Sequence, residues 1–205
     1  MNRNSTYTLL SVFFCVCLIA SNIFETKIFP LGPITLTGGF LIFPFSYILN
    51  DCLSEVYGYG KARTAIFTAF GVNLFFLAMA QAVRALPEVE YGTAQEHLDY
   101  LFKADLRITC ASMAAFFIGS IINAKVMSGM KVRQGEKGFW LRAIVSSLAG
   151  EGADSLIFFP IAFRGIGVRN IITLMITQVL LKTAYEVVVL PLTAISVKKM
   201  KTLPE

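Results

Sequence analysis

Long apolar stretches separated by short charged gaps constrain the fold of this 205-residue chain more than any other feature. Hydrophobic residues make up 56% of the sequence and charged residues only 15%, whereas soluble chains carry about a quarter charged residues. A helix needs about 20 apolar residues to cross a bilayer. The stretches that meet this requirement are residues 8–29, 38–57, 64–85, 106–126, 141–163 and 171–197. We therefore expect an all-α membrane protein in which residues 1–205 form a single bundle of six transmembrane helices.

Basic side chains are unevenly distributed among the segments that join these spans. With both termini inside, the inner segments hold eleven Lys and Arg residues, the outer segments hold six, and Lys182 lies within the last span. Basic segments are retained on the cytoplasmic side of a membrane. This bias predicts two cytoplasmic termini, and it explains the net charge of +5 without a nucleic-acid partner.

The longest external segment, residues 86–105, is acidic and contains a helix-start signal. Thr93 and Glu96 have the spacing of a capping box, in which each side chain satisfies a free backbone N–H. We therefore expect a short helix in this loop, leading toward the fourth span. The single histidine, His97, falls in that helix and is interpreted as a solvated surface residue.

Ionisable side chains within the apolar stretches are the candidates for function. Near the bilayer centre each costs about 2.5–3.5 kcal/mol on insertion scales, so such groups must face one another, water or a ligand. A rise of about 1.5 Å per residue gives their depths. Those near the midplane are Asp51, Glu151, Asp154, Lys182 and Glu186, with Glu55 nearer the inner face. Uncharged polar residues at similar depths are Asn22, Asn50, Asn73 and Gln178.

The polar residues of each span recur three or four positions apart, which places them on one helical face. They are Gln178, Lys182 and Glu186 in the last span, Asp51 and Glu55 in the second, and Glu151 and Asp154 in the fifth. This spacing predicts a shared polar interior. The alternative is an ion pair of Lys182 that merely locks the bundle, but one lysine cannot neutralise the surrounding carboxylates.

Proline and aromatic residues flank the acids. Phe-Pro-Phe at 43–45 precedes Asp51, and Phe-Phe-Pro at 158–160 follows Asp154. Since these two helices are expected to run antiparallel, both clusters would lie above the acids, either as a stacking shelf or as tolerated kinks with lipid-facing rings. The rings of the shelf would be Phe43, Phe45 and Phe158. Such a pocket suits a flat solute rich in donors, such as a guanine-type edge, and it equally suits a cation.

Two segments carry a family resemblance, FPFSYILNDCLSEVYG at 43–58 and GEGADSLIF at 150–158, together with the Ser21-Asn22 pair, Lys182, Glu186 and Pro191. With these segments the chain resembles the queuosine precursor transporter family, also called vitamin-uptake-transporter-like. The resemblance implies a bacterial inner-membrane, multi-pass importer of 7-deazaguanine bases for tRNA modification. The bases would be 7-cyano-7-deazaguanine (preQ0), its aminomethyl form or queuine. Matching positions give candidate ligands Asn22, Asp51, Glu55, Glu151, Asp154 and Lys182.

Depth and spacing add Asn73, Gln178 and Glu186 to this set of ligands. In the resulting hypothesis, Asp51 and Asp154 hold the donor edge of the base, and Lys182 holds its carbonyl. The partners are then a small-molecule base and the lipid bilayer, with a homo-oligomer left open. No cofactor, metal or enzymatic activity is expected.

Other functions remain open at this point. The chain has no Walker motif, so a substrate-binding subunit that relies on a separate ATPase, for another heterocycle or vitamin, is the main alternative. An intramembrane aspartyl protease would use Asp51 and Asp154 as a dyad. However, GEGAD differs from the Gly-x-Gly-Asp signature by one inserted residue. A channel is disfavoured because the charges form a cluster on unequal helices and not a symmetric ring.

Overall fold

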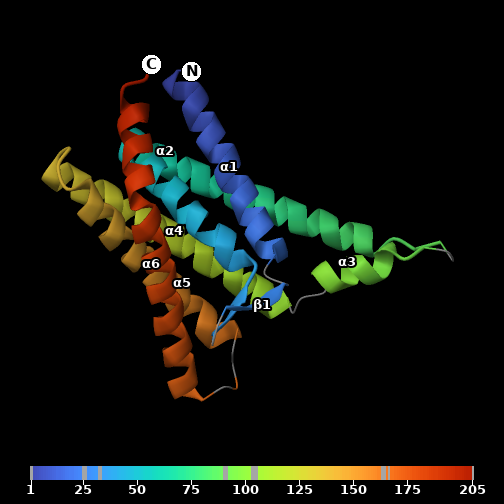
Figure 1. Cartoon of the computed structure of the whole chain (residues 1–205). Coiled ribbons are helices and arrows are strands. Elements are labelled where there is room, and N and C mark those ends of the chain that lie inside the picture. Colours follow the sequence, from blue (N-terminus) through green and yellow to red (C-terminus); the bar gives the residue numbers. More distant parts are fainter. Residues whose placement is uncertain are drawn as a thin grey trace.

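The structure is a computed structural model that describes residues 2–24, 27–31, 34–89, 92–102, 106–162, 165 and 167–204. Its elements are α1 (Arg3–Phe24), β1 (Ile28–Leu31), β2 (Ile34–Thr37), α2 (Gly39–Arg84), α3 (Ala94–Phe102), α4 (Leu106–Gln134), α5 (Phe139–Ala162) and α6 (Val168–Lys201) (Figure 1). All the helices except α3 are long and apolar enough to cross a membrane. The prediction of an all-α membrane protein is therefore confirmed.

Helix α2 contains two of the predicted spans. Gly58, within its 46 residues, has φ 80° and ψ 169°, a conformation that side chains with a Cβ rarely adopt. The chain turns at this glycine, and the halves 39–57 and 59–84 diverge from it (Figure 1). These halves correspond to the predicted spans 38–57 and 64–85, and each is about as long as a crossing requires.

The first predicted span extends too far. It was expected to end at Phe29, whereas α1 ends at Phe24 and Phe29 lies in β1. Strand β1 pairs antiparallel with β2, with Ile28 opposite Thr37. Apolar character extends past Phe24, but Pro30 cannot continue a helix, and the β-branched residues of this segment favour strands. A small hairpin thus joins α1 to α2.

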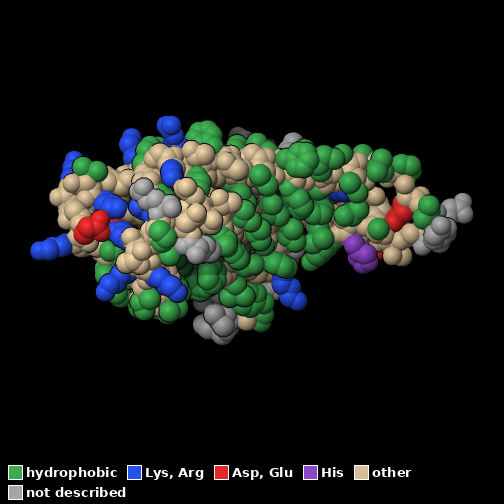
Figure 2. Space-filling model, turned by 90° about the horizontal axis from the view of Figure 1, so that it is seen from above, with side chains coloured by type: hydrophobic (Ala, Val, Ile, Leu, Met, Phe, Trp, Pro, Cys, Tyr) green, Lys and Arg blue, Asp and Glu red, His purple; other side chains and the backbone are tan. Residues whose placement is uncertain are grey.

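Helix α3 confirms the short helix predicted in the external loop. It begins at Ala94, directly after Thr93 of the predicted capping box. The backbone N–H of Gln95 donates to Glu88 Oε1 at 2.9 Å, so the side chain of an upstream acid caps this helix. Arg84 at the end of α2 pairs with Asp99 at 2.9 Å, which holds α3 against α2. His97 is exposed, as expected (Figure 2).

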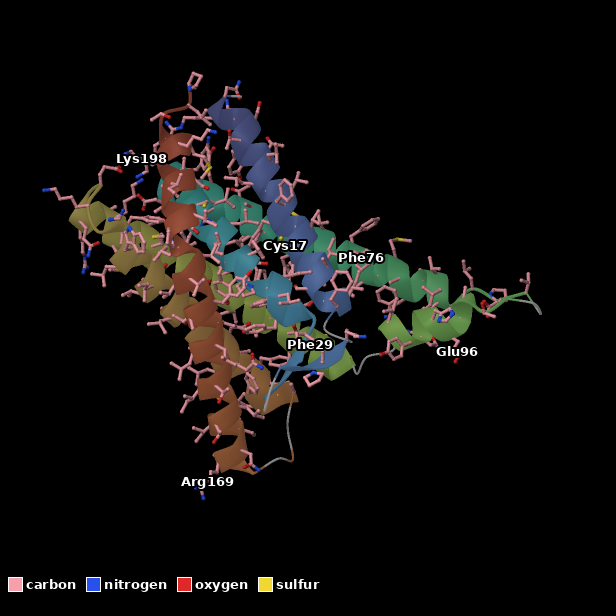
Figure 3. The ribbon with its side chains drawn as sticks, in the orientation of Figure 1. Cys17, Phe29, Phe76, Glu96, Arg169 and Lys198 are labelled. Carbon is pink, nitrogen blue, oxygen red and sulfur yellow. The ribbon has the colours of Figure 1, made fainter. Side chains whose placement is uncertain are left out.

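Both termini lie at the same end of the bundle, where the backbone N–H of Arg3 donates to Pro204 O at 2.8 Å (Figure 1). The Gly58 turn lies at this end too, because Tyr57 Oη, next to the turn, donates to Arg3 O near the N-terminus. The α4–α5 turn also lies here, because its Glu136 pairs with Lys201 near the C-terminus. We call this the N/C end. The hairpin and the start of α6 lie toward the other end, and Lys198 and Arg169 mark the two ends of α6 in Figure 3.

Lys and Arg side chains gather around the α4–α5 turn and the termini, while apolar side chains cover most of the rest of that face (Figure 2). Two termini at one end agree with an even number of crossings. That this end faces the cytoplasm remains a prediction from the charge distribution.

Helices α4 and α5 approach each other most closely at two glycines. A Cβ added to Gly119 would lie 2.7 Å from Gly150 O, and one added to Gly150 would lie 2.9 Å from Gly119 O. Only hydrogen fits at either position, as in other close helix contacts in membranes. This contact positions α5, because Glu151 and Asp154 follow Gly150 within about one turn.

Candidate functional site

Lys182 of α6 lies inside the bundle between an acid and an aromatic ring. Its Nζ is 3.6 Å from Asp154 Oδ2 on α5 and 4.1 Å from the centre of the Phe43 ring on α2. A carboxylate and a ring face both attract an ammonium group, and both attractions are stronger away from water. Three helices therefore meet at one mostly buried cation, which we call the Lys182 site.

Neighbouring aromatic residues fix the Phe43 ring. Its centroid is 5.6 Å from that of Tyr47 and 5.4 Å from that of Phe116 on α4. Tyr47 in turn reaches the α4–α5 contact, since a Cβ built on Gly119 would lie 2.9 Å from Tyr47 Oη. The ring that faces Lys182 is therefore held by Tyr47 of its own helix and by Phe116 of α4.

A second acid of α5 lies one turn from Asp154. Glu151 is fully buried, and Thr183 Oγ1 on α6 donates to its Oε2 at 3.3 Å. Its other oxygen, Oε1, has no hydrogen-bond partner among the described residues. Thr183 is adjacent to Lys182, so α5 and α6 are joined by two polar contacts side by side.

Asp51 and Glu186 line a small cavity between α2, α5 and α6. The other lining residues are Ile48, Ala143, Ile144, Thr183, Val187, Leu190 and Thr193. Ser146 Oγ donates to Asp51 Oδ1 at 3.3 Å. The free space is about 10 Å³, which is about the room that one water molecule needs. The bundle is thus closed around these acids and has no room here for a flat base.

Hydroxyl groups that the sequence analysis did not select surround the acids. Buried oxygens without a partner among the described residues include those of Tyr47, Ser147, Ser155, Glu151 and Glu186. Such atoms are rare in protein interiors, where water or a ligand normally satisfies them. A sequence signal exists for the three hydroxyls, because each lies four positions from a membrane acid: Tyr47 before Asp51, and Ser147 and Ser155 around Glu151.

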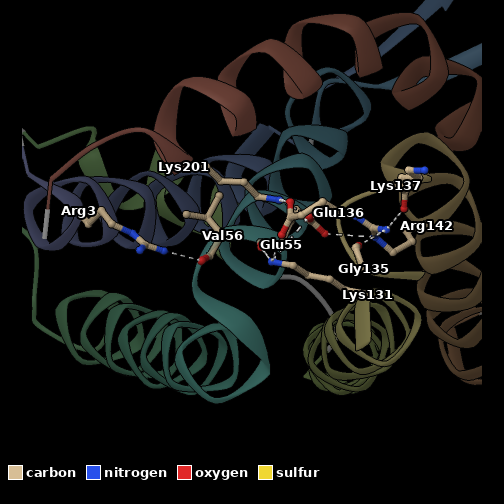
Figure 4. Close-up of polar contacts among 9 residues, drawn as sticks. All are labelled: Arg3, Glu55, Val56, Lys131, Gly135, Glu136, Lys137, Arg142 and Lys201. Carbon is tan, nitrogen blue, oxygen red and sulfur yellow. Dashed lines mark hydrogen bonds and ion pairs between the residues drawn. The ribbon is translucent and has the colours of Figure 1, made fainter. Parts of the chain in front are cut away.

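Glu55 belongs to a separate cluster near the N/C end (Figure 4). Its carboxylate accepts hydrogen bonds from Arg142 at 3.0 and 3.3 Å and from Lys201 Nζ at 2.6 Å. Lys131 Nζ lies 3.8 Å from the same carboxylate, and Glu136 pairs with both lysines. Helices α2, α4, α5 and α6 thus converge on one buried acid. We call these five residues the Glu55 cluster.

Two members of this cluster differ in exposure. Arg142 is one of the eleven basic residues predicted on the inner side, but it is 0% exposed and serves as the direct partner of Glu55. Glu136 is 70% exposed in the α4–α5 turn. The hydrogen bond from Lys201 lowers the pKa of Glu136 below its ordinary value.

The remaining predicted residues lie in other contacts. Asn22 Nδ2 donates to Asn73 Oδ1 at 3.5 Å, which joins α1 to the second half of α2. Gln178 is half-buried on α6. Phe45 is 43% exposed and packs against Tyr185, and Phe158 packs against Phe159. Asn50 donates to Ser120 O and to Asn123 Oδ1, and so ties α2 to α4.

The structure therefore divides the predicted residues into groups. The Lys182 site and the adjoining cavity bring together Phe43, Asp51, Glu151, Asp154, Lys182 and Glu186. Glu55 pairs with cations elsewhere, and the pair Asn22 and Asn73 lies between α1 and α2. Asp154 pairs with Lys182, and Asp51 accepts from Ser146, which is not the arrangement of a protease dyad that shares one proton.

Comparison with known proteins places these residues in a family. The family described as "Putative vitamin uptake transporter" matches residues 37–196, which include every residue of the Lys182 site. A Bacillus subtilis (strain 168) protein named "Probable queuosine precursor transporter" is 26% identical over 184 residues, covering 89% of this chain and 80% of the relative. An Escherichia coli (strain K12) protein named "Queuosine precursor transporter" is 30% identical over 155 residues, covering 75% and 67%.

No solved structure matches the chain. The match to the family covers most of the sequence, and its name assigns a transport role and not an enzymatic one. With its apolar helices and bacterial relatives, the chain is a multi-pass bacterial membrane protein. It belongs to the putative vitamin uptake transporter family.

Proposed function

We propose that this chain imports 7-deazaguanine precursors of queuosine, and that the Lys182 site binds the base. The names of both relatives point to queuosine precursors. The observation that carries the proposal is the position of the Lys182 ammonium, which lies between the Asp154 carboxylate and the Phe43 ring. A cation, an acid and an aromatic ring within one interior can each contact a different part of a guanine-type base.

The chemistry of such a base matches these groups. Its ring N–H and exocyclic amine donate side by side, and a carboxylate accepts both, so Asp154 would take this edge. The carbonyl on the same ring accepts a hydrogen bond, which Lys182 would donate. The flat face stacks on an aromatic ring, and Phe43 would supply it. Binding of the base would therefore weaken the ion pair of Asp154 with Lys182, and hydrogen bonds of both side chains with the base would replace it.

The closed state of the bundle bears on the route of the base. The Glu55 cluster joins four helices near the N/C end, and the cavity beside the Lys182 site holds only about 10 Å³. A base would therefore enter and leave by movement of helices about the site, as in alternating access. Entry from the hairpin end would leave the Glu55 cluster intact until the base is bound.

The test uses bacterial cells that cannot make the precursor and that lack their own importer. Expression of the chain should restore queuosine in tRNA when 7-cyano-7-deazaguanine, its aminomethyl form or queuine is supplied, each in turn. Asp154→Asn and Lys182→Met should abolish restoration at equal membrane levels. Lys198→Met, an exposed change on the same helix, should have no effect. Failure with every precursor, or normal restoration by Lys182→Met, would overturn the proposal.

A related experiment separates this function from that of a substrate-binding subunit. Purified chain in liposomes should take up labelled base without ATP or a second protein. Uptake that appears only when a separate ATPase is added would favour the subunit.

A further inference from the structure

Three of the acids buried in the bundle have no cation partner. Among the described residues, Glu55 pairs with Arg142, Lys131 and Lys201, and Asp154 pairs with Lys182. No described cation lies within ion-pair distance of Asp51, Glu151 or Glu186, and all three are buried. A buried carboxylate without a counter-charge takes up a proton, because the ionised form costs several kcal/mol away from water.

Two of these three acids face a common space. Asp51 on α2 and Glu186 on α6 both line the cavity of about 10 Å³, and they are 3% and 7% exposed. Ser146 donates to one oxygen of Asp51, and Glu186 Oε1 has no partner among the described residues. Carboxyl groups that face each other in a dry site share protons, since both cannot be ionised together.

Polar groups connect this pair to the Lys182 site. Thr183 lines the same cavity and donates to Glu151 Oε2. Glu151 lies one turn before Asp154, the partner of Lys182. A series of oxygen atoms thus leads from the cavity toward the residues that would bind the base, which is the arrangement of proton relays in membrane transporters.

Among the described residues, the buried and half-buried charged groups nearest the cavity already have partners. Helix α2 also contributes Glu55, α4 contributes Lys131, and α5 contributes Arg142, and these three belong to the Glu55 cluster. The remaining groups are Glu151 and Asp154 of α5 and Lys182 of α6, which bind Thr183 or one another. Among the described residues, the uncharged polar neighbours of these two acids are Ser146 and Asn123 at Asp51, Ser147 at Glu186, and Thr183 in the cavity wall. Their charge can change without breaking an ion pair.

We propose that Asp51 and Glu186 carry a transported proton and that the chain couples import of the base to inward proton movement. The inference rests on the proposed transport function. One carboxylate takes a proton from water on the outer side and releases it to water on the inner side, so only an O–H bond forms and breaks. The probe base, 7-cyano-7-deazaguanine, is neutral, so each cycle with one proton and one such base moves one positive charge inward.

The experiment measures proton movement and base movement separately. Purified chain is placed in liposomes that contain a pH-sensitive dye, and labelled 7-cyano-7-deazaguanine is the probe. With the outside more acidic by one unit and the membrane potential held at zero by potassium and valinomycin, wild-type protein should accumulate the base up to about tenfold at one proton per base. The dye should report internal acidification that depends on added base. With no gradient, protein in base-loaded liposomes should exchange internal for external base.

Two variants isolate the acids of the cavity. Glu186→Gln and Asp51→Asn keep the size of the side chain but cannot ionise, so each should reduce gradient-driven accumulation far more than it reduces exchange. Glu136→Gln, a change of the same kind at an exposed position, should behave as wild type in both assays. If Glu186→Gln does not fold, Asp51→Asn supplies the same comparison, and the wild-type dye signal does not depend on either variant.

The outcomes are distinct. Wild-type exchange without accumulation or acidification would overturn the coupling proposal and leave the transport function intact. Gradient-driven accumulation by both variants at the wild-type level would also overturn it. Absence of exchange by wild-type protein with any of the three precursors would instead refute the proposed function.

Discussion

The guanidinium of Arg142 meets the carboxylate of Glu55 at 3.0 Å in the interior of the bundle, and neither side chain is exposed. The pair joins the start of α5 to the middle of α2, just before the Gly58 turn. Lys201 reaches the same carboxylate from the last turn of α6. The N/C end is therefore held together by charge as well as by apolar packing.

Loss of Arg142 should destabilise the bundle. Removing one partner of a buried ion pair costs about 3–5 kcal/mol, and Lys201 would compensate only in part for Arg142→Gln because it is partly exposed. The measurement is the free energy of unfolding in mixed micelles titrated with dodecyl sulfate. Arg133→Gln, an exposed change at the end of α4, should cost less than about 0.5 kcal/mol. Equal losses in the two variants would contradict this role of Arg142.

Two glycines of α5 should respond in opposite ways to alanine. A Cβ at Gly150 would lie 2.8 Å from Asn123 Cβ and 2.9 Å from Gly119 O, so Gly150→Ala should cost about 1–3 kcal/mol. Nothing lies within 4 Å of a Cβ at Gly152, so Gly152→Ala should be neutral or stabilise by up to about 1 kcal/mol. Thermal unfolding in detergent compares them, and a tolerated Gly150→Ala would show that α4 and α5 can separate freely.

The ion pair of the Lys182 site can be tested for structural and binding roles at once. Lys182→Met alone leaves Asp154 without its cation and should lower stability by about 3 kcal/mol. The double variant Lys182→Met/Asp154→Asn should recover most of that stability, because no charge is left unpaired. Uptake of base should remain at least about tenfold below wild type in both, since a tenfold loss corresponds to one good contact. A double variant that transports normally would assign the pair to structure alone.

Acid should remove a small contribution of Glu136 to stability. The hydrogen bond from Lys201 lowers the pKa of Glu136 in the folded protein below its ordinary value of 4.5. A lowered pKa stabilises the fold above the unfolded value, and this contribution disappears as the pH falls through the folded value. The stability difference between wild type and Glu136→Gln should thus be positive near pH 7 and vanish on acidification.

Because the Glu136 side chain is 70% exposed, that difference should stay below about 1 kcal/mol. The control is the same change in a Lys201→Met background, which lacks the hydrogen bond and should show a smaller pH dependence. A difference that grows as the pH falls would have the wrong sign and would exclude the hydrogen bond from Lys201 as its cause.

Hydropathy and charge predicted most of the fold because they report the length and number of crossings directly. They placed the end of the first helix at Phe29, five residues beyond its actual end at Phe24, because an apolar strand has the same composition as an apolar helix. They also separated the second and third spans correctly. That the chain turns between them at Gly58, and does so without a loop, depends on backbone angles that composition does not determine.

The candidate site was predicted in part. Helical spacing selected Asp154 and Lys182, and the proline–aromatic cluster selected Phe43; these three side chains lie together in the structure. Helical spacing could not show that Glu55 and Asp51, one turn apart, have different partners. Glu55 pairs with Arg142, which is buried. In the sequence, Arg142 looks like one more basic residue near the membrane surface. Pairing across helices depends on rotation and register, and these are set by contacts such as Gly119 with Gly150.

The contact between Gly119 and Gly150 also has a consequence for motion. Backbones in direct contact pack at the closest distance that helices allow, so we expect α4 and α5 to stay together and to move as one unit. Helix α6 meets α5 through the hydrogen bond of Thr183 with Glu151 and the ion pair of Lys182 with Asp154, and such contacts can break and re-form. A solute in the bundle would therefore face one fixed wall, which carries Glu151 and Asp154, and one moving wall, which carries Lys182 and Glu186.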